Sequence, residues 1–232
     1  MAHKMHAFED RAALAAALAD RVSAELHAAI ASRGSASLAV SGGSTPKQFF
    51  EVLSTRPIAW DRVVVTLVDE RFVGPDNTRS NHLLVKTHLL QNAAAKAAFV
   101  PLYHPVASAE EAAALATAEI ATFGKPFDVT ILGMGNDGHT ASFFPGGNHL
   151  AEALDRSAPR RVMTMEAEGA GETRITLSFS ALCDSRLLVL HIEGAEKKAV
   201  LDKALSGTDE AEMPVRAVLE RSKTAPDIYW AP

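Results

Sequence analysis

Two residues that can move protons stand one residue apart just after an apolar run: Asp137 and His139. A histidine can take a proton from water near physiological pH, and a nearby carboxylate can hold its tautomer and favour its cation. A single loop histidine is more commonly held by backbone carbonyls. From this pair alone, a general base and a structural histidine are both open.

The same segment has the glycine spacing of a dinucleotide-binding loop, at Gly133, Gly135 and Gly138. A Rossmann loop needs a helix that starts inside the glycines to receive a pyrophosphate. Here Pro145 and two following glycines leave room for only about two helical turns. We therefore interpret the match as accidental and expect no dinucleotide at this loop.

A second glycine segment, SGGSTP at 41–46, has the composition of an anion-binding turn. Gly42 and Gly43 allow a tight turn, Ser44 or Thr45 can cap a helix, and Pro46 suits its first position. Unpaired N–H groups at such a helix start bind anions. The alternative is a plain capped turn. The spacing of a nucleoside triphosphate loop is missing, so that ligand class is disfavoured.

Three ionisable residues in succession, DER at 69–71, follow the apolar run 63–68. Charges at the end of a buried strand are costly unless they are paired or bound to an ion, so Arg71 could face an anion or a developing oxyanion. A structural ion-pair network is the equal alternative. The segment RSNH at 79–82 predicts a helix start capped by Ser80 or Asn81, without a chemical role.

The elements that must position these residues alternate along the chain. Apolar runs rich in Val, Ile and Leu, typical of strands buried on both faces, lie at 37–40, 63–68, 128–132 and 187–192. Helical patterns lie at 9–32, where Gly34 ends the helix, and at 46–53, 80–90, 109–122 and 195–205. The alternation predicts an α/β fold with a mostly parallel open sheet, Rossmann-like, and helices on both faces. Weaker strand candidates, without an assigned place, lie at 161–165, 174–178 and 227–230.

In an open parallel sheet, ligands bind beyond the carboxyl ends of the strands, because the strand-to-helix loops open on that edge. The four strong strand candidates are followed by SGGSTP, DER, the loop of Asp137 and His139, and a segment that leads to Lys197. We therefore expect these segments to meet. The stretches 145–150 and 166–172 are predicted loops.

Size and composition exclude several classes of protein. The chain has 232 residues, 47% of them hydrophobic, and we expect one domain over 1–232. A formal charge of −5 disfavours nucleic-acid binding, and the lack of a long uncharged apolar run disfavours a membrane span. The remaining histidines lack metal-site spacing, so we expect no metal.

The lone cysteine, Cys183, cannot form an internal disulfide, and we interpret it as a buried apolar side chain. The apolar positions of the opening segment are broken by charged residues, which indicates an amphipathic helix rather than a secretory signal. We therefore expect a cytoplasmic protein.

Taken together, these segments resemble the 6-phosphogluconolactonases, relatives of glucosamine-6-phosphate deaminase and ribose-5-phosphate isomerase. The matching segments, in family order, are SGGSTP (41–46), DERFV (69–73), SN (80–81), LGMGNDGHTASFFPG (132–146), RITL (174–177) and GAEK (194–197). The residues after His139, TASFFP, are similar to the lactonase branch rather than the deaminase branch. One departure is Gly74, where lactonases commonly carry a proline that here comes one residue later, at Pro75.

The resemblance implies hydrolysis of 6-phospho-D-glucono-1,5-lactone to 6-phosphogluconate in the oxidative pentose phosphate pathway, without a cofactor. It implies that His139 is the general base, Asp137 orients it, and Arg71 or loop N–H groups stabilise the oxyanion. The phosphate would lie on the glycine turn, with Arg174 and Lys197 supplying positive charge. The implied substrate-binding residues are Gly42, Gly43, Ser44, Thr45, Asp69, Arg174 and Lys197.

Two rivals and the oligomeric state are open. An amino-sugar phosphate deaminase or isomerase would share the phosphate turn and could use Asp69 as the base at C2. A sugar-phosphate sensor would keep the site without turnover, although a sensor needs no base. We expect a monomer, with a dimer as the alternative.

Overall fold

The computed structural model describes residues 3–123 and 126–232. Its main sheet has seven strands, all paired in parallel. In sheet order they are β1 (Lys4–Ala7), β10 (Asp227–Ala231), β9 (Leu187–Glu193), β6 (Val129–Leu132), β2 (Ala36–Val40), β3 (Val63–Leu67) and β5 (Ala98–Val100). The four strong strand predictions therefore form the centre of this sheet. Strands β1 and β5 were not predicted, because β1 is mostly exposed and β5 has only three residues, so neither has a clear apolar pattern.

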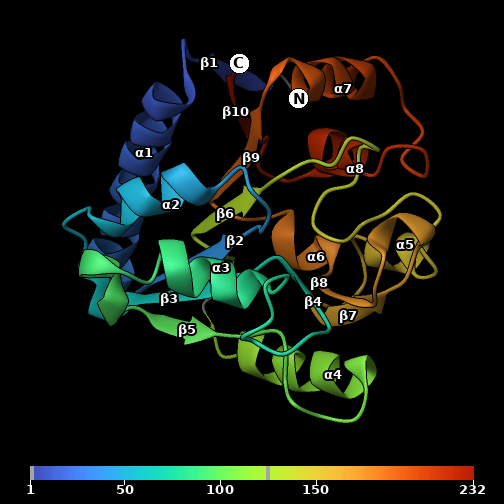
Figure 1. Cartoon of the computed structure of the whole chain (residues 1–232), viewed down its shortest axis with the longest axis horizontal. Helices are drawn as coiled ribbons and strands as arrows, with labels where there is room; N and C mark the ends of the chain where they lie inside the picture. The colour runs from blue at the N-terminus through green and yellow to red at the C-terminus, as the bar shows by residue number, and fades with distance from the viewer. Residues whose placement is uncertain (1–2, 124–125) are drawn as a thin grey trace.

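The chain reverses its direction of travel between β2 and β6. From β1 through β2 and β3 it moves toward the β5 edge, whereas from β6 through β9 to β10 it moves toward the β1 edge. Since parallel crossovers are right-handed, this reversal places α1 (Arg11–Arg33), α2 (Lys47–Ser54) and α3 (Asn81–His88) on one face of the sheet, and α7 (Ala195–Leu205) and α8 (Val215–Arg221) on the other (Figure 1). The predicted fold class is confirmed. The carboxyl ends of β2 and β6 form the topological switch point, where such sheets bind ligands.

A second, antiparallel sheet was not predicted, although two of its three strands coincide with the weaker strand candidates at 161–165 and 174–178. It consists of β4 (Asp69–Arg71), β8 (Arg174–Leu177) and β7 (Val162–Met165), and helix α4 (Ala109–Ile120) packs against β7 and β8. The segment DER is therefore a strand of its own rather than the tail of β3. Only Val68 separates the two strands. Its backbone N–H donates to the Val40 carbonyl at 2.9 Å. The apolar run continues to residue 68, so the sequence pattern does not show where the chain passes from one sheet to the other.

The structure confirms the predicted end of α1 at Gly34 and the predicted cap of α3 at Ser80, but not the predicted caps of α2. Asp10 accepts from the Ala13 N–H at 2.7 Å at the start of α1, and Gly34, with φ of 81°, ends that helix. Ser80 caps α3. The prediction for α2 is wrong: neither Ser44 nor Thr45 caps it, because the helix begins one residue late, at Lys47, without a side-chain cap bond.

The remaining described elements are short. They are α5 (Leu150–Ala153), α6 (Phe179–Leu182) and the 3-10 turns η1 (Trp60–Arg62), η2 (Asn92–Lys96) and η3 (Glu168–Ala170). A continuous cluster of buried hydrophobic side chains fills both faces of the main sheet. Cys183 is buried and free, as expected. Within residues 3–123 and 126–232, no helix is long and apolar enough to cross a membrane.

Candidate functional site

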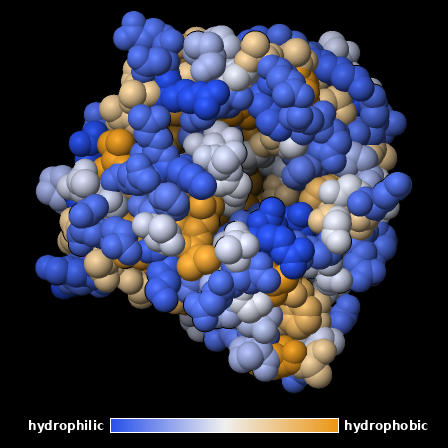
Figure 2. Space-filling view, viewed as in Figure 1, coloured by the Kyte–Doolittle hydropathy of each residue, from blue (hydrophilic) through white to orange (hydrophobic). Residues whose placement is uncertain are grey.

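A pocket of about 250 Å³ opens beyond the carboxyl ends of the central strands. Figure 2 shows a hollow near the centre of a mainly hydrophilic face, over the ends of β2 and β6 in the view of Figure 1. Nine of the predicted site residues line the pocket: Gly42, Gly43, Ser44, Thr45, Asp69, Arg71, His139, Arg174 and Lys197. The tenth, Asp137, stands directly behind His139. The predicted meeting of distant segments is confirmed.

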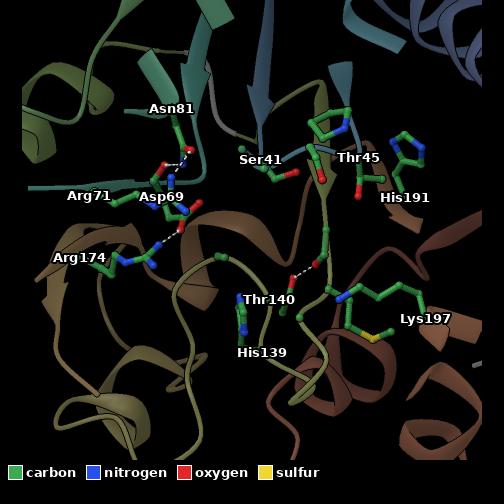
Figure 3. A pocket seen from close by; sticks show the side chains of 18 residues that line it. Ser41, Thr45, Asp69, Arg71, Asn81, His139, Thr140, Arg174, His191 and Lys197 are labelled. Atoms are coloured by element: carbon green, nitrogen blue, oxygen red, sulfur yellow. Dashed lines mark hydrogen bonds and ion pairs between the residues drawn. The ribbon is translucent and has the colours of Figure 1, made fainter. Parts of the chain in front are cut away.

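The pocket has two cationic sides. Figure 3 shows Arg71 and Arg174 on one side, Thr45 and Lys197 on the other, and His139 between them. The family resemblance implies that Arg174 and Lys197 both supply positive charge to one phosphate. The structure separates them, so a ligand in the pocket would meet a cation at each end.

Asp137 holds the His139 ring in one orientation. The Asp137 carboxylate Oδ1 accepts from His139 Nδ1 at 2.6 Å and from the His139 backbone N–H at 3.1 Å. Burial opposes ionisation of Asp137, but the hydrogen bonds and charge of His139 outweigh it and lower the pKa of this carboxyl. Because Nδ1 carries the donated proton, Nε2 is the ring nitrogen that can accept one.

The loop glycines make room for this pair. A Cβ on Gly135 would lie 2.1 Å from His139 Nδ1 and 2.5 Å from Asp137 Oδ1, so a side chain there is incompatible with the observed positions. A Cβ on Gly133 would meet only Ser41 Oγ, at an ordinary 3.6 Å. The nucleotide-like spacing is accidental, as predicted, since no helix follows until α5. The physical need for glycine at position 135 is clearance for the Asp137–His139 pair.

Two contacts support the loop of His139, and neither was predicted. The Phe144 ring lies against the His139 ring, with centroids 4.3 Å apart. Gly138 has φ of 79°, its carbonyl accepts from the Val215 N–H at 2.9 Å, and a Cβ there would strike Met213. The start of α8 therefore fixes the loop, although Val215 lies 77 residues after Gly138 along the chain.

The glycine turn is fixed by Asn81. A Cβ on Gly42 would lie 1.8 Å from Asn81 Oδ1, and Asn81 Nδ2 donates to the Asp69 carbonyl at 2.9 Å. Gly43 has φ of 88°, and Ser44 is exposed at the pocket. The turn thus presents backbone N–H groups rather than a capped helix start. Asn81 is a pocket residue to which the sequence assigned no chemistry.

A buried carboxylate holds Asn81 and Arg71 in place. Glu70 is fully buried, and it accepts from the backbone N–H groups of Arg71, Asn81 and His82 and from the Ser80 hydroxyl, at 2.7–3.0 Å. Burial raises the pKa of Glu70, while these four hydrogen bonds act in the opposite direction. This arrangement combines both interpretations of DER: Glu70 is structural, whereas Arg71 lines the pocket.

Arg174 faces Arg71 directly across the β4–β8 ladder. Its Nη2 donates to the Ala170 carbonyl at 2.8 Å, its Nη1 lies 3.8 Å from Asp69 Oδ2, and its guanidinium lies 5.3 Å from the Phe144 ring centroid. Burial lowers the pKa of Arg174, and the charge of Arg71 adds to that effect. Like charges directly opposite each other on a sheet are unfavourable, so an anionic group between them would be stabilised.

Lys197 extends from the first turn of α7 to the other side of the pocket. Burial lowers the pKa of Lys197, and the nearby carboxylates of Glu196 and Asp137 offset only part of this effect. Glu196 also accepts from Asn136 Nδ2 at 2.7 Å, which ties α7 to the loop of His139. The same side of the pocket includes His191, which sequence analysis missed because it lies within the apolar run of β9.

In the described part of the chain, no group of three or more His, Cys, Asp or Glu side chains is arranged to hold a metal ion. The pocket brings together an oriented imidazole, cationic side chains on two sides and a glycine turn. This combination suits attack of water on an electrophilic carbon of an anionic substrate.

Comparison with known proteins agrees with this geometry. Residues 9–230 match the family model described as glucosamine-6-phosphate isomerases/6-phosphogluconolactonase. The chain is 62% identical over 232 residues to the 6-phosphogluconolactonase of Rhizobium meliloti, covering 100% of both chains. It is 45% identical over 215 residues to the 6-phosphogluconolactonase of Pseudomonas aeruginosa, covering 93% of this chain and 89% of the relative.

Solved structures show the same architecture. The crystal structure of a 6-phosphogluconolactonase from Shewanella baltica has a TM-score of 0.96 at 42% identity and covers 100% of this chain and 98% of that one. A monomeric glucosamine-6-phosphate deaminase, at 17% identity, has a TM-score of 0.79 over 98% of this chain and 97% of that one, which shows a common fold. The chain therefore belongs to the glucosamine-6-phosphate isomerase/6-phosphogluconolactonase family.

Proposed function

We propose that this protein hydrolyses 6-phospho-D-glucono-1,5-lactone to 6-phospho-D-gluconate, the second step of the oxidative pentose phosphate pathway. The observation that carries the proposal is the Asp137–His139 pair, joined at 2.6 Å, in one pocket with a glycine turn and Lys197. The names of the relatives at 62% and 45% identity support the lactone as substrate. A cytoplasmic location and a monomeric state are still predictions from the sequence.

The phosphate end of the substrate is assigned to the side of Thr45 and Lys197. Backbone N–H groups of the turn and the ammonium of Lys197 together suit a dianion. Gly43 is exposed at the pocket, so an oxygen atom can approach the backbone there without meeting a side chain. Arg174 is assigned to the opposite end, because its guanidinium lies beside Asp69 and Arg71.

The chemical step uses the free nitrogen of His139. Nε2 takes a proton from a water molecule while the water oxygen bonds to the lactone carbonyl carbon, and the carbonyl becomes an oxyanion facing Arg71 and Arg174. The oxyanion then collapses, the bond from this carbon to the ring oxygen breaks, and the imidazolium returns its proton to that oxygen. The products are a hydroxyl and a carboxylic acid, which ionises.

A deaminase would need Asp69 as a free base at C2. In this structure Asp69 Oδ2 accepts the Ser142 hydroxyl at 2.6 Å and faces Arg174, so this oxygen is already engaged. We therefore favour the lactonase. Release of ammonia from glucosamine 6-phosphate at a rate comparable to lactone hydrolysis would reverse this choice.

The direct test of the proposed function is acid release from freshly generated 6-phosphogluconolactone, corrected for spontaneous hydrolysis. We expect rapid turnover, and a lower kcat/KM for the unphosphorylated lactone because it lacks the group that the turn and Lys197 bind. Equal rates with both lactones would remove the phosphate assignment. No acceleration of either would show that the pocket binds without turnover, as a sensor would.

A further inference from the structure

His191 is a buried titratable residue of the pocket that the proposed mechanism does not use. It lies on β9, only 2% of its surface is exposed, and it lines the pocket on the side of Thr45 and Lys197 (Figure 3). The Phe49 ring of α2 packs edge-on against it, with centroids 6.1 Å apart. Because the His191 side chain is buried, each of its two ring nitrogens is expected to have a hydrogen-bond partner.

One ring nitrogen has a clear partner. Nε2 lies 3.1 Å from Glu193 Oε1, and His191 and Glu193 share a face of β9 because they are two residues apart on a strand. A carboxylate can only accept, so Nε2 carries a proton. Glu193 is also held by Arg11 of α1, whose Nε lies 3.4 Å from Oε2.

The other ring nitrogen, Nδ1, is buried, and no residue that the structure describes forms a hydrogen bond with it. As an unprotonated nitrogen it is tolerable there, but a second proton would make it a buried cationic donor without an acceptor, which is costly. An anion held by the glycine turn, which lines the same pocket, would bring negative charge to the ring.

We propose that His191 is a further binding residue for the anionic end of the substrate, and that its ring gains a proton when a dianion occupies the turn of Gly42 to Thr45. The inference rests on the proposed placement of the phosphate. The charged groups near the ring are Glu193 at Nε2, Arg11 of α1 at the other oxygen of Glu193, and Lys197 of α7, which lines the same pocket. Glu193 favours the cation and Lys197 opposes it, so a bound dianion can decide the balance.

The proposal makes His191 a selector for phosphorylated sugars. With the dianion bound, two cations, Lys197 and the protonated His191, would hold the phosphate. Because the bound state then holds one proton more than the free state, we expect the affinity for a dianion to weaken as the pH rises, in a step that depends on His191.

The first test uses sulfate, whose charge does not change in this pH range, and the intact protein. Binding heats measured at pH 7 in two buffers of different ionisation enthalpy give the number of protons taken up. We expect uptake by the wild type, little or none by His191→Gln, which keeps a polar atom near Glu193, and continued uptake by His139→Gln. Uptake by His191→Gln equal to that of the wild type would overturn the proposal.

A second variant leaves the histidine in place. Glu193→Gln removes the carboxylate that favours the ring cation, so it should also lower proton uptake while sulfate still binds through the turn and Lys197. Wild-type uptake in Glu193→Gln, with the thermal unfolding of the variant unchanged, would contradict the assignment of Nε2. This arm is informative even if His191→Gln does not fold.

Kinetics separate this inference from the proposed function. KM of His191→Gln for the phosphorylated lactone should be about tenfold above wild type at pH 6 and should approach wild type at pH 8, with kcat little changed. No lactone hydrolysis by the wild type would defeat the proposed function while the sulfate experiment still tests His191. Normal hydrolysis with an unaltered KM profile in the variant would defeat only the role of His191.

Discussion

At the scale of single residues, the chemistry depends on how closely the loop lets Asp137 and His139 approach each other. Their 2.6 Å contact is possible because position 135 carries no side chain, and the Phe144 ring supports the imidazole. The sequence alone identifies Asp137 and His139, since their types and spacing are visible in one segment. It does not identify Phe144 or the role of Gly135, because those depend on contacts that only the folded loop makes.

Gly135→Ala should disable catalysis without unfolding the protein. Its Cβ would lie 2.1 Å from His139 Nδ1, so the ring or the Asp137 carboxylate must move away. We expect kcat to fall by about 10²-fold or more, as for loss of a general base, with KM little changed. Gly133→Ala is the matched control, because its Cβ makes only an ordinary contact. Equal activity of the two variants would show that the pair needs no such clearance.

Lys197 should give phosphate binding an alkaline limit. Burial lowers the pKa of this ammonium, so its charge is lost as the pH rises at a lower value than for an ordinary lysine, whose pKa is about 10.4. Affinity for 6-phosphogluconate, measured by calorimetry from pH 8 to 10, should therefore decline across this range. The Lys197→Arg side chain stays charged throughout this range, so the affinity of that variant should not decline. An identical slope in both proteins would contradict the assignment.

At the scale of elements, the junction of β3, β4 and α3 is organised by the buried Glu70. The four groups that reach its carboxylate at 2.7–3.0 Å all donate, so both oxygens are used as acceptors. This junction sets the position of Arg71 and Asn81 at the pocket. A change at Glu70 should therefore alter both the free energy of unfolding and the positions of Arg71 and Asn81 in the pocket.

Glu70→Gln should destabilise the protein by about 1–3 kcal/mol, because the new amide NH₂ would face groups that also donate. Chemical denaturation of wild type and variant at neutral pH measures the difference. Glu220→Gln, at a residue whose side chain is 55% exposed on α8, is the control and should stay within about 0.5 kcal/mol of wild type. A loss no greater than in the control would mean that Glu70 does not hold the junction.

Most elements could be predicted from the sequence, and the failures have physical causes. The central strands and long helices carry clear apolar periods, and Gly34 marks the end of α1. Strands β7 and β8 were predicted without a place in a sheet, and their sheet was missed because β4 has three residues and follows β3 after Val68 without a break in the apolar run. The start of α2 was misplaced because Ser44 and Thr45 belong to the pocket rather than to the helix cap.

At the scale of the whole molecule, the site exists because the chain reverses direction between β2 and β6. The reversal sends helices to opposite faces and leaves the carboxyl ends of these two strands open side by side. The glycine turn follows β2, and the loop of His139 follows β6. Each strand end thus contributes one of the two functions, anion binding and proton transfer, that the proposed reaction combines.

The central claim is that His139 takes the proton from the attacking water. The most direct measurement is kcat for acid release from freshly generated 6-phosphogluconolactone by wild type and His139→Ala, with the binding of 6-phosphogluconate as a check on the pocket. The account predicts that kcat falls by about 10²–10⁴-fold while the product still binds. A His139→Ala protein with near-normal turnover would contradict it.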